Sequence, residues 1–126
     1  MRKKIQVTGI EQTTAIDKYI AKKLSVLESF VGEDDSAIAE VEIGKQSNHH
    51  RSGLIYFAEI NLHITGKNLR AVNEAEDLYS AIDQVKDDIQ RQVVSYHDKR
   101  RAVGKKGRAL VKAVLKGQLS RKTMHA

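Results

Sequence analysis

The chain has 126 residues, of which 40% are hydrophobic, so it can build one domain around a single modest core. It has no Cys, which excludes a disulfide framework, a thiol nucleophile and a thiolate metal site. No apolar run reaches signal-peptide or membrane-spanning length, so we expect a soluble cytoplasmic protein that is not exported.

The charge is divided unevenly along the chain. Residues 1–96 carry 12 Lys and Arg against 15 Asp and Glu, a net charge of −3, whereas residues 97–126 carry 10 against Asp98 alone, a net charge of +9. A segment this basic repels itself unless a polyanion neutralises it, which favours nucleic acid as a partner. Solubilising disorder is the plain alternative. Membrane association is a weaker one, because residues 110–119 offer a short apolar face without an aromatic anchor.

The first part of the chain predicts a strand, a helix and a second strand. Ile5 and Val7 alternate with polar residues, as in a half-buried strand. The helix should be capped by Thr14 with Asp17 as its reciprocal partner, and its apolar residues return on one face at Ile16, Tyr19, Ile20, Leu24 and Leu27. An acidic loop separates it from a half-buried strand whose inner positions are Ala37, Ala39, Val41 and Ile43.

Two more strands and a long helix follow. Residues 44–53 form a polar hairpin loop that we expect to be mobile. The next strand runs to Ile64, and Phe57 on its second face is the one ring that we expect to be exposed. Gly66 turns the chain into a shorter strand near residues 69–72. From Asp77 the apolar spacing changes to three and four, which predicts a long amphipathic helix with its stripe at Leu78, Ile82, Val85, Ile89, Val93 and Tyr96.

The predicted order is β-α-β-β-β-α, an α+β domain with both helices packed on one face of a four-stranded sheet. The other sheet face should be open. We expect the domain to occupy residues 1–102. Residues 103–126 should be a basic C-terminal tail, flexible or folding on binding, because they contain too little apolar surface to fold alone.

Three short motifs carry a resemblance: Ile5-x-Val7-x-Gly9, Gly66-x-x-Leu69-Arg70-Ala71 and Asp77-Leu78-Tyr79-Ser80-Ala81-Ile82-Asp83. With them, residues 1–101 resemble the ribosome hibernation-promoting factor family, which includes the ribosome-associated inhibitor A proteins. The resemblance implies a bacterial stress-response or stationary-phase protein that binds the small ribosomal subunit in the channel between head and body. There it would overlap the sites of messenger RNA and tRNA, silence translation and protect the idle ribosome.

The length matches the short type of this family. The resemblance implies the small subunit with its rRNA, and the intact ribosome, as partners, and a monomer off the ribosome. No cofactor, small-molecule substrate or membrane is expected.

The resemblance also implies where rRNA binds, because family contacts come largely from basic residues of the two helices. By position these are Lys22, Lys23, Lys86, Arg91 and Lys99. Asp88 stands where members often have Lys, so cations of the C-terminal segment would add to the interface: Arg100, Arg101, Lys105, Lys106 and Arg108. Such contacts neutralise phosphates without reading sequence. The alternative for Lys86 and Arg91 is an ordinary solvated helix face.

No enzyme is predicted, because no nucleophilic triad or paired acids are suggested by spacing. His49 and His50 lack the further ligands of a zinc site, and residues 103–108 fail the spacing of a phosphate-binding loop. A different class of function remains open: a regulatory adaptor that binds a protein through its open sheet face, with the basic tail tethering it to nucleic acid. Binding through phosphates should weaken steeply with salt, whereas a sheet-face protein contact should not.

Overall fold

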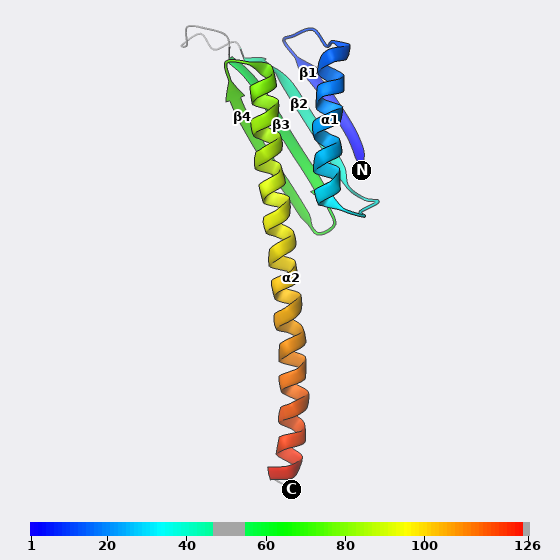
Figure 1. Ribbon diagram of the computed structural model, residues 1–126, viewed down its shortest axis with the longest axis vertical. Helices are drawn as coiled ribbons and strands as arrows, with labels where there is room; N and C mark the ends of the chain where they lie inside the picture. The colour runs from blue at the N-terminus through cyan, green and yellow to red at the C-terminus, as the bar shows by residue number, and fades with distance from the viewer. Residues whose placement is uncertain (47–54, 125–126) are drawn as a thin grey trace. The chain divides into compact units, whose positions relative to one another are not determined.

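A computed structural model describes residues 1–46 and 55–124, apart from the side chains of residues 105, 108, 111, 112 and 115–124. The elements in chain order are β1 (Arg2–Thr8), α1 (Thr14–Val31), β2 (Ile38–Gln46), β3 (Ile55–Ile64), β4 (Lys67–Ala75) and α2 (Leu78–Met124). Figure 1 shows them along the chain. The predicted α+β class and the β-α-β-β-β-α order are confirmed. The chain divides into two compact units, Met1–Val93 and Val94–Ala126.

The four strands form one sheet in the order β1-β2-β3-β4. β1 pairs with β2 in parallel, and the other two neighbouring pairs are antiparallel. A parallel pair needs a long crossover connection, which α1 supplies, whereas antiparallel neighbours need none. Thr65 and Gly66 form the turn between β3 and β4, and the φ of +80° at Gly66 is one that glycine adopts without strain.

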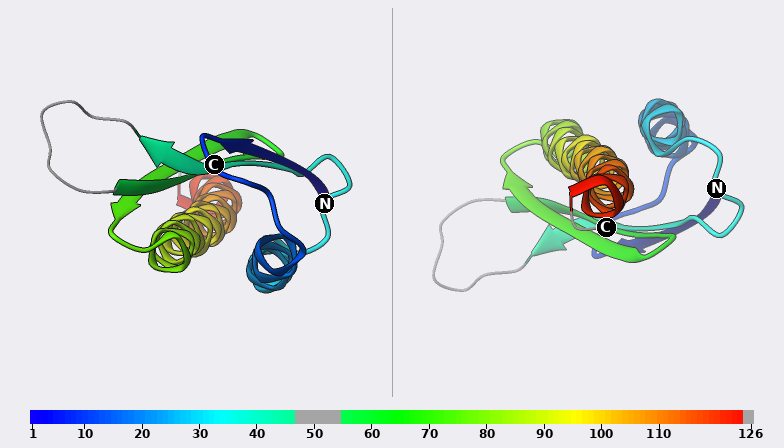
Figure 2. Two further views of the ribbon diagram at one scale, coloured as in Figure 1. Left: turned by 90° about the horizontal axis from the view of Figure 1, so that it is seen from above. Right: turned by 90° about the horizontal axis from the view of Figure 1, so that it is seen from below.

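Within the unit Met1–Val93, α1 and α2 lie on the same side of the sheet (Figure 2). We call this the helix side, and the opposite side the open face; the described residues place no helix over the open face. The helices bury their predicted stripes against the inner positions of the strands. The largest fully buried side chains are Ile20, Leu24, Leu27, Ile43, Leu62, Ile89, Val85 and Val93. Burial of these side chains stabilises the domain at roughly 25 cal/mol per Å² of apolar surface.

The start of α1 differs from the prediction by one residue. Thr13, not Thr14, is the N-cap, and its hydroxyl accepts a hydrogen bond of 3.2 Å from the backbone N–H of Ile16. Asp17 accepts a hydrogen bond of 2.7 Å from the Gln12 side chain instead of closing a capping box. Two adjacent threonines are equally good caps by residue type, so the sequence did not distinguish them.

The prediction that Phe57 is an exposed ring was wrong, because its exposed fraction is 9%. Phe57 is on the open face as predicted, but it lies opposite Gly44 of β2, which has no side chain. A Cβ at Gly44 would be 3.0 Å from the ring carbon Cε1 of Phe57. The ring therefore lies over the Gly44 backbone and is covered.

Two expected segments extend differently in the structure. Residues 44–46 of the predicted loop belong to β2, and the rest of that loop, residues 47–54, lies outside the described residues. Residues 103–124, expected as a tail, are helical and belong to α2. The 47-residue helix α2 continues for several turns beyond its buried stripe. The spacing of apolar residues therefore predicted the part of the helix that packs on the sheet, but not where the helix ends.

Candidate nucleic-acid interface

Four of the predicted RNA-binding cations lie in the unit Met1–Val93. Lys22 and Lys23 are on α1, and Lys86 and Arg91 are on α2. Lys22 and Arg91 are exposed, whereas Lys23 and Lys86 are half-buried. Because both helices lie on one side of the sheet, all four cations belong to the helix-side layer (Figure 2). The fold thus places on one side of the sheet cations that are more than 60 positions apart in the sequence.

Lys23 is fixed between the two helices by a polar cluster, which we call the helix-bridging cluster (Tyr19, Lys23, Tyr79 and Asp83). Lys23 Nζ lies 3.0 Å from Oδ1 of Asp83, and the Tyr19 hydroxyl donates a 2.5 Å hydrogen bond to the same oxygen. The rings of Tyr19 and Tyr79 meet edge to face with centroids 4.8 Å apart. Lys23 Nζ also lies 5.2 Å from the centroid of the Tyr19 ring. The cluster therefore holds a cation in a defined place on the helix side.

The electrostatics of this cluster favour its charged form. Partial desolvation raises the pKa of Asp83, but the hydrogen bonds from Tyr19 and Lys23 and the charges of Lys23 and Lys86 outweigh it, so the pKa is lowered. The hydrogen bond to Asp83 raises the pKa of both Lys23 and Tyr19. Lys23 is thus a permanent cation and Tyr19 a neutral hydrogen-bond donor at neutral pH.

The two α2 cations have acidic neighbours on their own helix. Lys86 Nζ lies 3.3 Å from Oδ1 of Asp87, and its side chain is only 12% exposed. Arg91 pairs with Asp88, which also accepts a 2.7 Å hydrogen bond from Asn73 of β4. These carboxylates cancel part of the positive charge on α2. Lys22 is the exposed α1 cation next to Lys23, and it adds positive charge to the same side.

Other predicted cations lie in the second unit, Val94–Ala126. Lys99 and Lys106 are exposed. Arg101 is 2.5 Å from Asp98, and the Arg100 guanidinium carbon lies 5.6 Å from the centroid of the Tyr96 ring. The positions of Lys105 and Arg108 are helical, but their side chains are outside those described. This unit provides a strongly basic helix surface of its own.

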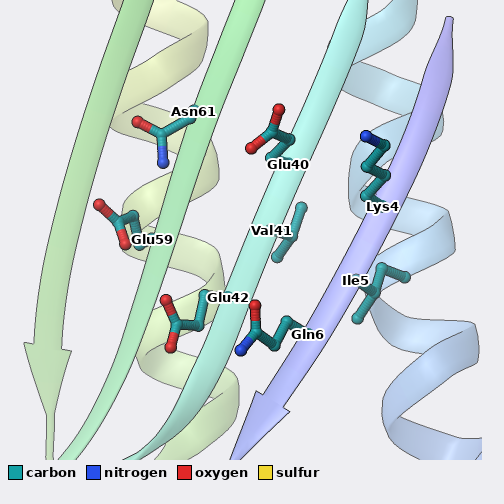
Figure 3. A pocket seen from close by; sticks show the side chains of 8 residues that line it. All are labelled: Lys4, Ile5, Gln6, Glu40, Val41, Glu42, Glu59 and Asn61. Atoms are coloured by element: carbon teal, nitrogen blue, oxygen red, sulfur yellow. The ribbon is translucent and has the colours of Figure 1, made fainter.

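The open face has the opposite charge at its centre. Figure 3 shows a shallow depression there, lined by Lys4, Ile5, Gln6, Glu40, Val41, Glu42, Glu59 and Asn61. Arg70 of β4 is 2.6 Å from Glu59, so part of the acidity is neutralised from the next strand, and His63 Nε2 is 3.3 Å from Oε1 of Glu40. Three glutamates side by side repel phosphates. A polyanion would therefore meet the helix side more favourably than the open face.

Among the described residues, no group of three His, Asp or Glu is placed to hold a metal ion. His49 and His50, the pair that was considered for metal binding, lie outside these residues. In the part of the chain that the structure describes, no helix combines the length and apolarity needed to cross a bilayer.

Sequence reasoning missed the helix-bridging cluster. It identified Lys23 as an RNA-binding residue and quoted Tyr79 and Asp83 within a motif, but it gave Asp83 no partner. The contact joins residues 60 positions apart. Only the packing of α1 against α2 reveals it. The motif Asp77–Asp83 was the one signal that marked these positions.

Comparison with known proteins identifies relatives of this chain. The family described as sigma 54 modulation protein / S30EA ribosomal protein matches residues 4–101. The ribosome hibernation promoting factor of Klebsiella oxytoca is 29% identical over 97 residues, which cover 75% of this chain and 94% of that protein. The ribosome hibernation promotion factor of Staphylococcus aureus (strain COL) is 29% identical over 96 residues, which cover 76% of this chain but 48% of that protein.

Solved structures show the same fold. The crystal structure of the Thermus thermophilus Protein Y N-terminal domain has a TM-score of 0.64 and 30% identity, covering 76% of this chain and 99% of that one. A ribosomal subunit interface protein from Coxiella burnetii has a TM-score of 0.61 at 18% identity, covering 78% and 99%, which supports the fold alone. Since the family match covers most of the chain, the chain belongs to the sigma 54 modulation protein / S30EA ribosomal protein family.

Proposed function

We propose that this protein is a ribosome hibernation factor of the bacterial cytoplasm. It binds the small ribosomal subunit in the decoding channel and blocks messenger RNA and tRNA by occupying their sites. The family and its relatives, two of which are named for ribosome hibernation, support the general role. Binding of rRNA in the decoding channel is the more specific part of the proposal, and it rests on how charge is distributed over the domain. Cations of both helices lie on one side of the sheet, and carboxylates lie at the centre of the other side.

Binding would proceed mainly through phosphate contacts. Lys22, Lys23 and Arg91 can each neutralise a phosphate and release counterions, which gives affinity without sequence reading. Arg91 would exchange its pairing with Asp88 for a phosphate. Fixing Lys23 through Asp83 lowers the side-chain entropy lost on binding, because the amine is already held in place.

Blocking is steric in this proposal and needs no chemistry. The buried core makes the unit Met1–Val93 rigid, so this unit would keep its shape in the channel. Few rings are available for stacking on unpaired bases: among the described side chains, the exposed aromatic residues are Phe30 and Tyr79. Recognition of folded rRNA by shape and charge therefore fits this surface better than single-strand binding.

The proposal is tested by reversing charge on each side of the sheet. The double variant Lys22→Glu with Arg91→Glu alters the helix side, and Arg2→Glu with Lys4→Glu is a control of equal charge change, because both residues lie on the open face of β1. We expect the first to bind small subunits at least about tenfold more weakly, and the slope of log affinity against log salt to fall by about 0.7–0.9 per lost phosphate. Equal losses in both variants would contradict a specific helix-side interface.

A further inference from the structure

The second unit carries an exposed apolar stripe that phosphate binding does not use. Val103, Leu110 and Val114 are 68%, 66% and 57% exposed, more than any other large hydrophobic side chain among those described. At 100° per residue, these three positions lie within about 40° of one another on α2. We call them the apolar stripe. All three follow residue 101, where the family match ends, so the stripe is a feature of this chain's own extension.

Cations flank the apolar stripe on both sides. Relative to Val103, Arg100 lies about 60° to one side, and Lys106 lies about 60° to the other. Lys106 is exposed, and Arg100 is exposed with its guanidinium near the Tyr96 ring. A narrow apolar row with a cation on each side near its N-terminal end matches a groove that is apolar along its floor and acidic along its rims. Folded RNA supplies anions, but the faces of its paired bases are stacked on one another and leave little apolar surface for Val and Leu side chains.

Gly107 lies on the same surface, about 40° from Val103 and between it and Leu110 along the helix. A Cβ added there would meet nothing within 4 Å, so the glycine is not required by packing inside the chain. Glycine within a helix is destabilising relative to Ala. Its presence on the stripe leaves a notch where a partner can approach the helix backbone closely.

We propose that the apolar stripe docks in an acidic-rimmed apolar groove of a protein component of the small ribosomal subunit. This proposal rests on the proposed function, since it assumes the small subunit as the target. A second copy of the chain is a poor occupant, because pairing the stripes would bring two segments of charge +9 together. The basic segment thus serves two partners, with its cations binding rRNA and its stripe binding protein.

The test compares intact small subunits with protein-free small-subunit rRNA. The stripe variant changes Val103, Leu110 and Val114 to Gln. The control variant changes Ala102, Ala109 and Ala113 to Gln, which are exposed and lie about 80–120° from Val103 on the same helix. We expect the stripe variant to lose about tenfold or more in affinity for intact subunits and to bind the rRNA normally. The control should bind both like the native chain, and circular dichroism checks that the helix content of all three proteins agrees.

Each other outcome overturns the inference in a distinguishable way. Equal losses on subunits and on rRNA would mean that the stripe contacts RNA. Full binding of the stripe variant to subunits would mean that the stripe docks on no subunit protein, with the proposed function intact. If the stripe variant instead kept its subunit affinity and lost binding to phosphatidylglycerol vesicles, the stripe would be a membrane contact. Failure of the native chain itself to bind subunits would overturn both proposals.

A second pair of variants tests the notch without making the stripe polar. Gly107→Ala fills the notch, and Gly104→Ala, about 100° from Val103, changes a neighbouring helical glycine off the stripe. Both should raise helix content. We expect only Gly107→Ala to weaken binding to intact subunits, by several-fold, and equal affinities for the two variants would show that no partner enters the notch.

Discussion

Lys23 of α1 and Asp83 of α2 form an ion pair, with 3.0 Å between Nζ and Oδ1, and Tyr19 donates a hydrogen bond to the same oxygen. The pair connects the two helices that cover the sheet, and it fixes one of the cations that we propose bind rRNA. A carboxylate in a basic interface would ordinarily weaken phosphate binding. Here Asp83 also positions its partner, so its removal should affect both stability and binding.

Asp83→Asn should lower the free energy of unfolding at neutral pH by about 0.2–1 kcal/mol, because the pair is partly exposed and screened by solvent. The folded-state pKa of Asp83 is lowered, so its contribution is present above the ordinary carboxyl pKa and is lost as the pH falls through the folded value. Urea titrations of both proteins at several pH values measure this. The difference in the free energy of unfolding between the two proteins should shrink in acid. A constant difference down to pH 2 would show that the ionised form of Asp83 does not stabilise the fold.

Asp34 provides a clearer pH dependence. Hydrogen bonds from the Ser36 hydroxyl and from Thr65 lower the pKa of this carboxyl to about 2. The bonds to Thr65 tie the loop before β2 to the turn after β3. Stability from Asp34 should therefore be full above pH 4 and be lost as the pH falls towards 2. Thermal unfolding of Asp34→Asn and the native chain should differ at pH 6 and converge near pH 2; a difference that persists in acid would refute this.

Gly44 is the position where the sheet tolerates no side chain. A Cβ there would lie 2.1 Å from the carbonyl oxygen of Thr8 and 3.0 Å from the Phe57 ring. Since the first neighbour is backbone, Gly44→Ala should destabilise the domain by about 2–3 kcal/mol in denaturant titrations. Gly107→Ala, which meets nothing, is the control and should not destabilise. Native stability of Gly44→Ala would mean that β1 and β2 can move apart at little cost.

Removal of residues 103–126 deletes the part of the basic C-terminal helix that follows the domain. All of the buried hydrophobic residues described lie between Ile16 and Val93, so the truncated chain should unfold within a few degrees of the native one. Its affinity for small subunits should fall, and so should the salt dependence of binding, because cations that neutralise phosphates are lost. Calorimetry and sedimentation measure the two effects. Unchanged affinity would show that the segment contributes nothing to binding.

The sequence predicted correctly those helices and strands in which apolar residues recur at a regular spacing over many positions. The aliphatic residues of the predicted stripes of α1 and α2 and the inner positions of β2 are buried as predicted, because a buried face requires apolar residues at a fixed spacing, whereas Tyr19 and Tyr96 of those stripes are half-buried. Phe57 was misjudged because its cover depends on Gly44, a residue on another strand. The pairing of Lys23 with Asp83 depends on the packing of two helices, which no local pattern contains. The predicted rRNA contacts themselves remain predictions.

The most direct test of the central proposal is displacement of initiator tRNA. Small subunits are loaded with messenger RNA and labelled initiator tRNA, and the purified protein is added in increasing amounts before sedimentation. We predict that tRNA leaves the subunits in proportion to the protein that binds, and that high salt abolishes both effects. Binding of the protein to the subunits with tRNA still in place would contradict occlusion of the decoding channel.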